Sequence, residues 1–143
     1  MKVTANITMA YIINYMNRYC SVSLEKAFCD FAASKTFVGL MYLKSRICLE
    51  IAPEVLFMYA DECGLELNED DFDSFNDAYD IPDKLQYTVN MSEAYREFKG
   101  ISTKEYGAYL KSHRLWPLIY DNYNTLSSFN KSDFLAKLDE LNK

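Results

Sequence analysis

The side chains with the strongest catalytic potential are one histidine and four cysteines. A general base needs a nucleophile or carboxylate partner at close range, and the run Lys111-Ser112-His113-Arg114 indicates none, so a surface or capping role is expected for His113. The cysteines lack the close C-x-x-C pairs of a zinc site and are predicted to be buried, reduced thiols: Cys20, Cys29, Cys48 and Cys63. We therefore predict no catalytic residue, no cofactor, no metal and no enzymatic activity.

The second chemical feature is an acidic run, with ten carboxylates and no base between Asp61 and Asp83. A calcium loop beginning at Asp71 would need glycine where Asn76 stands and glutamate where Pro82 stands, so the EF-hand template fails. Two interpretations remain open: a solvated linker, or an acidic surface that meets a basic partner. In the second case, the partner-binding residues are Asp70, Asp71 and Asp73.

Composition and charge exclude several classes of protein. Half of the residues are apolar, which excludes a disordered chain, and only 4 are Gly and 3 Pro, which excludes collagen and low-complexity classes. The net charge is −6, yet residues 1–60 and 84–143 each carry +2 without clustered Lys or Arg, which disfavours nucleic acid as a partner. No run of 18 apolar residues and no targeting signal is found, so we expect a cytoplasmic protein with no membrane contact.

Apolar residues recur at helical spacing along most of the chain. The pattern predicts helices over 6–19, 24–33, 34–44 and 52–63 before the acidic run, and over 85–98, 102–112, 115–123 and 132–141 after it. Ser102 and Ser132 are the expected caps of two of them, and Gly64 and Gly100 are candidate stops. Pro82 and the acids predict a connector with at most a short turn between the two sets.

The two sets of helices resemble each other when the chain is shifted by 79 residues. The segment Val22-Ser23 then falls on Ile101-Ser102, and apolar positions fall on apolar positions, as in Phe37 with Trp116, Leu40 with Ile119 and Tyr59 with Leu138. We therefore predict an all-α fold of two tandem related four-helix units, 1–64 and 84–143, joined by an acidic linker, 65–83. Units this small bury little area alone, so the two should pack together as a helical bundle.

The second unit also resembles a small uncharacterised bacterial helical family of about 70 residues. The matching positions are Ser102, Glu105, Trp116, Ile119, Tyr123, Leu126, Asp133 and Leu138; the first unit, with Ser34-Lys35-Thr36-Phe37, looks like a more diverged relative. Ser127-Ser128 replaces the His-Thr of the family, so no role of that histidine carries over. Such families are often encoded beside toxin or ADP-ribosyltransferase-like genes, and the resemblance implies an accessory or antitoxin-like role.

Aromatic residues give the second candidate binding surface. Tyrosine buries much area with few rotatable bonds and is a favoured interface anchor, although the tyrosines could instead cover a small core. Trp116, Tyr120 and Tyr123 share one helix face, on which we expect Trp116 to be buried and a tyrosine to be partly exposed. The candidate partner-binding residues of the second unit are Tyr106, Tyr109, His113, Arg114, Tyr120 and Tyr123.

The sequence therefore predicts a non-catalytic protein-interaction module whose partner is another protein, such as a toxin, with a homodimer as a further option. One alternative is a helix-turn-helix regulator built from 24–33 and 36–46, with Lys35, Lys44 and Arg46 facing nucleic acid. The other alternative is an enzyme with an unrecognised site.

Overall fold

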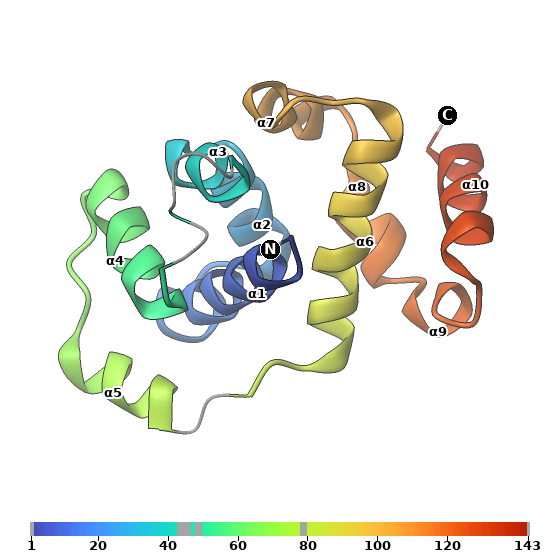
Figure 1. The fold of residues 1–143 in the computed structure, drawn as a ribbon. Coiled ribbons are helices and arrows are strands. Elements are labelled where there is room, and N and C mark those ends of the chain that lie inside the picture. The colour runs from blue at the N-terminus through green and yellow to red at the C-terminus, as the bar shows by residue number, and fades with distance from the viewer. Residues whose placement is uncertain (1, 43–46, 48–49, 78–79, 143) are drawn as a thin grey trace.

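The computed structural model describes residues 2–42, 47, 50–77 and 80–142, and all regular elements in these segments are helices (Figure 1). In chain order they are α1 (Lys2–Tyr19), α2 (Leu24–Ala32), α3 (Lys35–Met41), α4 (Ala52–Cys63), α5 (Glu69–Asp77), α6 (Asp83–Lys99), α7 (Thr103–Ser112), α8 (Leu115–Tyr120), α9 (Tyr123–Leu126) and α10 (Lys131–Leu141). The all-α fold class is confirmed. The end of the predicted 34–44 helix lies outside the described residues.

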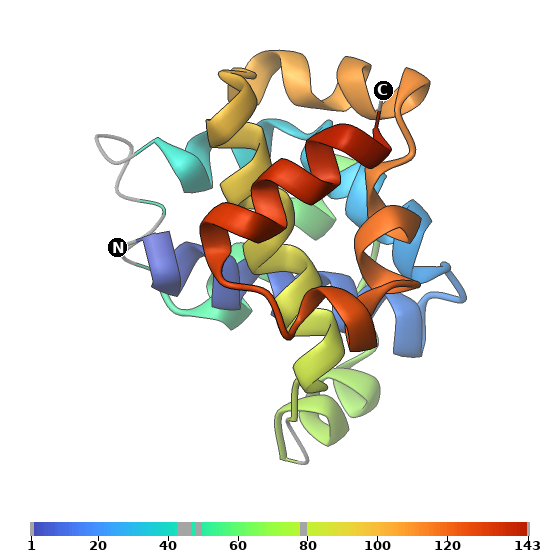
Figure 2. The ribbon, with the colours of Figure 1, turned by 90° about the vertical axis from the view of Figure 1, so that its right-hand side faces the viewer.

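Helix α1 is the centre of the first half, because it packs against α2, α3 and α4 and also against α6 of the second half. Its middle turns are buried on every side, and Met9, Ile12 and Ile13 have no exposed surface. In the second half, α6 packs against α8 and α10, and Figure 2 shows α10 lying across α6. The two long helices, α1 and α6, thus pack against each other and against most of the shorter helices.

Local capping signals set the ends of several helices. Gly64 and Gly100 adopt left-handed backbone angles, with φ of 66° and 70°, and end α4 and α6 as predicted. The Ser102 Oγ accepts the Glu105 amide at 3.2 Å and caps α7, also as predicted. The expectation for α10 was wrong: Asn130, not Ser132, accepts the capping amide, that of Asp133, at 2.8 Å.

The two halves meet at an aromatic cluster. Helix α7 packs against α2 and α3, and α8 packs against α2. The ring of Phe28 on α2 lies 4.9 Å from that of Trp116 and 6.1 Å from that of Tyr106. Gly107 permits this approach, because a Cβ there would lie 2.6 Å from the Cβ of Ala33. The halves therefore share one hydrophobic core.

A buried ion pair lies beside this cluster. Arg96 Nε donates to both carboxylate oxygens of Glu93, at 3.2 and 3.0 Å, and its Nη1 donates to the Ile101 carbonyl at 2.8 Å. The guanidinium carbon lies about 6 Å from the ring centroids of Phe37 and Tyr106. The pair fixes the loop between α6 and α7 and supports the aromatic rings that join the two halves.

Helix α5 differs from the sequence expectation of a connector with at most a short turn. Asn68 Oδ1 accepts the Asp71 amide at 3.0 Å and caps the helix, which favours the acids of its first turn. Phe75 is buried, and its ring lies 5.0–5.9 Å from the rings of three α1 tyrosines, Tyr11, Tyr15 and Tyr19. One apolar anchor thus allows an otherwise acidic segment to fold against the core.

Helices α3 and α4 are joined by one carboxylate. Glu62 at the end of α4 accepts the amides of Lys35 and Thr36, each at 2.8 Å, and the Thr36 hydroxyl at 2.7 Å. Partial burial raises the pKa of Glu62, but the hydrogen bonds from Thr36 and Lys35 together outweigh it and hold this pKa below its ordinary value. The ionised carboxylate is therefore the form that the fold stabilises.

We predict that Phe75→Ala lowers the free energy of unfolding by about 3 kcal/mol, because a buried ring is removed from three partners. Amide exchange in 69–77 should accelerate more than in α6, since few other contacts hold α5. Phe98, whose side chain is 53% exposed, provides the control: Phe98→Ala should cost less than about 1 kcal/mol. Equal losses in denaturant unfolding of the two variants would contradict the anchoring role.

We predict that Glu62→Gln lowers stability at pH 7 by about 1 kcal/mol, as for the loss of a helix cap. The folded pKa of Glu62 is below the unfolded value of about 4.3, so its stabilisation is complete above that value and is lost as the pH falls through the folded pKa. Chemical denaturation from about pH 7 to 3 should therefore show the two proteins converging in acid. Glu140→Gln, on an exposed side chain of α10, is the control and should change stability at pH 7 by less than about 0.5 kcal/mol.

Candidate functional site

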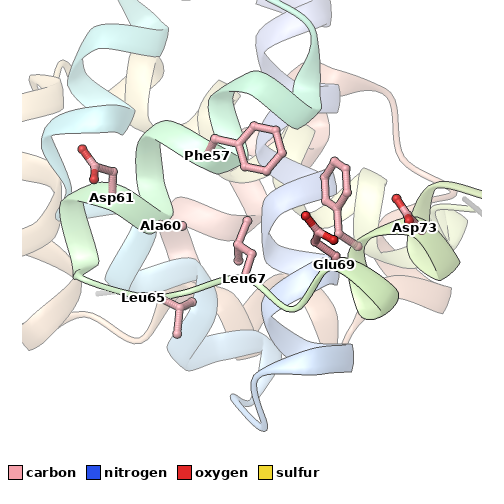
Figure 3. A pocket seen from close by; sticks show the side chains of 8 residues that line it. Phe57, Ala60, Asp61, Leu65, Leu67, Glu69 and Asp73 are labelled. Atoms are coloured by element: carbon pink, nitrogen blue, oxygen red, sulfur yellow. The ribbon is translucent and has the colours of Figure 1, made fainter.

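A surface groove of about 600 Å³ opens between the end of α4 and α5 (Figure 3). Its apolar lining comes from α4, α5 and the connection between them, and its rim is acidic. The lining residues are Phe57, Ala60, Asp61, Leu65, Leu67, Glu69, Phe72 and Asp73. Figure 3 shows the ring of Phe57 on one side and the carboxylates of Glu69 and Asp73 on the other.

The groove follows from the way in which the chain leaves α4. The left-handed Gly64 turns the chain sharply, and the non-helical run 65–68 carries it to the start of α5. Leu65 and Leu67 on this run are half-buried and form part of the apolar lining. The rings of Phe57 and Phe72 lie 4.9 Å apart and connect the two helices. Phe57 nevertheless remains 42% exposed, which is a large apolar surface in contact with water.

Three carboxylates surround this apolar surface: Asp61 on α4 and Glu69 and Asp73 on α5. Within the part of the chain that the structure describes, none of the three takes part in an ion pair. Their charges are therefore left uncompensated beside an apolar surface. These three carboxylates are the charged groups of the lining.

The three predicted acids lie in different surroundings. Asp73 lines the groove, and Asp70 is exposed on α5. Asp71 is half-buried, and it lies near Cys20 at the end of α1. The pKa of Cys20 is raised mainly by burial of the thiol and further by the negative charge of Asp71. Asp70 and Asp73 are thus open to a partner, whereas Asp71 is half-buried and its charge acts on Cys20.

The predicted aromatic residues of the second unit are largely engaged within the molecule. Tyr106 is completely buried, and its hydroxyl donates to the Ser92 carbonyl at 3.3 Å, so Tyr106 cannot contact a partner. Burial holds the pKa of this hydroxyl well above its ordinary value. Tyr109 stacks on His113, with ring centroids 4.2 Å apart, and its hydroxyl accepts from Asn142 Nδ2 at 2.7 Å.

The remaining candidates of this set lie near α8. Arg114 forms a two-pronged contact with Glu25 of α2, at 3.1 and 2.7 Å, but is mostly exposed. Trp116 is buried, as predicted, and its ring stacks at 5.6 Å on that of Tyr120, which also lies 4.0 Å from the Lys84 ammonium. Tyr123 is half-buried, and its ring lies 5.2 Å from that of Tyr87. These contacts tie α8 and α9 to α2 and α6.

The cysteines also depart from expectation. Cys20 and Cys29 are half-buried and Cys63 is exposed, whereas Cys48 lies outside the described residues. Burial, followed by the charges of Glu25 and Asp30, raises the pKa of Cys29 to about 11, so this thiol stays protonated at neutral pH. No group of three or more His, Cys, Asp or Glu in the described segments is placed to hold a metal ion.

The apolar part of the groove was not predicted from the sequence. The available signal was the neighbouring pair Phe57-Met58, since two large apolar residues in succession cannot both share the buried face of the helix with Val55 and Tyr59. Met58 is also exposed. A helix that is apolar beyond the width of one face indicates a second contact surface.

Comparison with known proteins finds no family model, no curated protein and no solved structure that matches this chain. None of the helices described here is long and apolar enough to cross a bilayer.

We predict that Phe57→Ala lowers the free energy of unfolding by about 1 kcal/mol or less, because its side chain is already partly in water and loses mainly the contact with Phe72. Phe31→Ala, on the buried face of α2, should cost about 3–5 kcal/mol. Thermal and urea unfolding of both variants measure the difference. A loss for Phe57→Ala as large as that for Phe31→Ala would show that the ring has a structural role.

Proposed function

We propose that this chain is a non-catalytic, cytoplasmic protein-interaction module that acts as an accessory or antitoxin-like partner of a bacterial toxin or defence protein. The observation that carries the proposal is the groove between α4 and α5, where a large exposed aromatic ring lies among unpaired carboxylates. Exposed apolar surface bordered by charge is typical of protein-binding sites. The association with a toxin comes from the family resemblance of the second unit.

A helix-turn-helix role is less well supported by the molecule. Helices α2 and α3 are joined by the two residues Ala33 and Ser34, but α3 has only seven residues. The Glu62 carboxylate occupies its first amides, where a phosphate would otherwise bind. Of the proposed contacts, Lys35 is exposed, and Lys44 and Arg46 lie outside the described residues. We therefore favour a protein as the partner.

We further propose that the chain consists of two related units, as the sequence shift of 79 residues suggests. The bounds of α1, α2, α3 and α4 recur in α6, α7, α8 and α10 at this shift, with starts that differ by at most two residues and ends by at most one. Buried positions recur with them, as in Phe37 with Trp116 and Tyr59 with Leu138.

Two hydrogen bonds recur at the same shift and support this proposal. Asn17 Nδ2 donates to the Val22 carbonyl at 2.9 Å, and Arg96, 79 residues later, donates to the Ile101 carbonyl at 2.8 Å. Each bond fixes the loop after the first helix of its unit. Ser23 then accepts the Lys26 amide at 3.1 Å, as Ser102 accepts the Glu105 amide at 3.2 Å.

The contacts between the units have the pattern of a pseudo-twofold arrangement. If the two units are related by a twofold axis, each contact between them should occur again with the roles of the units exchanged. The α1–α6 and α2–α7 contacts are their own counterparts, and the α2–α8 contact has the α3–α7 contact as its counterpart. All four contacts are present. The groove breaks this symmetry, since Phe57 corresponds to Ala136 and Met58 to Lys137. An apolar surface that the second unit does not repeat is not needed for the shared fold, which supports a binding role.

We predict that this protein forms a stable complex with the product of the gene adjoining its own and suppresses the toxicity of that product on co-expression. Phe57→Ser should weaken the complex by about tenfold or more, as expected at an interface anchor. Phe98→Ser, on a ring of α6 that is somewhat more exposed than Phe57, should leave affinity within about twofold. Calorimetric titration and growth curves measure both effects. Absence of any complex with the unsubstituted chain would overturn the proposed function.

A further inference from the structure

We propose that the groove between α4 and α5 binds a basic amphipathic helix of the partner protein. This inference rests on the proposed function and specifies the chemistry of the partner. The apolar side chains of the partner helix would contact Phe57, Leu67 and Phe72. Its lysines or arginines would contact Asp61, Glu69 and Asp73.

The shape of the site favours a helix. The groove is bounded by two helices joined by a short connection, and its apolar side chains form a strip from Phe57 on α4 through Leu65 and Leu67 to Phe72 on α5. Figure 3 shows Phe57, Leu65 and Leu67 along this path. Its volume of about 600 Å³ holds a few side chains rather than a whole domain. A helix presents side chains at i, i+3 or i+4, and i+7 on one face, which suits such a strip.

The charge of the site favours a basic occupant. Carboxylates stand on both sides of the groove, with Asp61 on α4 and Glu69 and Asp73 on α5, and in the described residues no base compensates them. They belong to a run of ten acids without a base, so the whole region attracts a cationic partner over a Debye length of about 8 Å at physiological salt. A cationic helix between the two sides would also reduce the repulsion between like charges.

The same charge argues against the other occupants. A second copy of this chain would bring its own acidic rim to the groove, and each copy has a net charge of −6. Nucleic acid would place phosphates beside the three carboxylates. An acidic or neutral helix would leave these carboxylates partly desolvated without a counter-charge, which is costly.

Two designed helical peptides test the inference. Both carry the same leucine and phenylalanine strip, and they differ only in having lysines or glutamates beside it. We expect saturable binding of the lysine peptide, with an affinity at least about tenfold above that of the glutamate peptide and a decrease as salt rises from about 0.05 to 0.5 M. Amide chemical shift changes should map to α4, α5 and the run 65–68.

Matched variants separate the groove from general attraction between opposite charges. Phe57→Ser should weaken binding of the lysine peptide about tenfold, and Phe98→Ser should not. The triple change Asp61→Asn, Glu69→Gln and Asp73→Asn should remove most of the salt dependence. The matched triple change Glu50→Gln, Asp121→Asn and Glu140→Gln, on exposed acids elsewhere, should leave most of it in place.

Three results would overturn the inference: no saturable binding of the lysine peptide, equal binding of the glutamate peptide, or equal effects of the two phenylalanine variants. If the natural complex forms while any of these holds, the proposed function stands and the chemistry assigned to its groove is wrong. If the lysine peptide binds in the groove and no complex with the adjoining gene product forms, the groove assignment stands and the choice of partner is wrong.

Discussion

The buried pair of Glu93 and Arg96 is the interaction on which the joining of the two halves depends. Both ions leave water, which costs several kcal/mol each, and the cost is offset only because the guanidinium donates to both carboxylate oxygens and to the Ile101 carbonyl. The same guanidinium lies beside the rings of Phe37 and Tyr106, which come from different halves. The guanidinium is held by Glu93 and the Ile101 carbonyl, and it lies beside rings from both halves at the point where they meet.

In helix α5 the charges are not compensated, and apolar contacts hold the helix in place. Its acids repel one another, and no compensating base lies between Asp61 and Asp83. What holds the helix is the burial of Phe75 among the α1 tyrosines, the 2.8 Å hydrogen bond from the Tyr11 hydroxyl to Asn76, and the contact between Phe57 and Phe72. Few contacts hold α5, so we expect its backbone amides to exchange faster than those of the long helices.

Sequence patterns predicted most helix bounds because those depend on local features: apolar spacing, capping side chains and glycines with positive φ. They did not predict α5, since its composition argues against a helix and its stability comes from Phe75 contacting residues more than fifty positions away. Nor did they distinguish Tyr106 from Tyr109, which lie three apart on α7. Which of the two faces the other half is decided by the packing of α7 on α2 and α3, which no local pattern encodes.

The groove lies where the core shared by the two halves ends. If the two units are related, their shared positions are constrained by a common core, and a binding surface can change freely only where that constraint ends. The end of α4 is such a place, because Gly64 turns the chain sharply there, and within residues 65–76 Phe75 is the only side chain that is fully buried. Exposed aromatic and acidic side chains collect there at little cost to stability. In the proposed complex, a partner with the complementary charge would supply the counter-charges and the apolar cover that the fold itself leaves out.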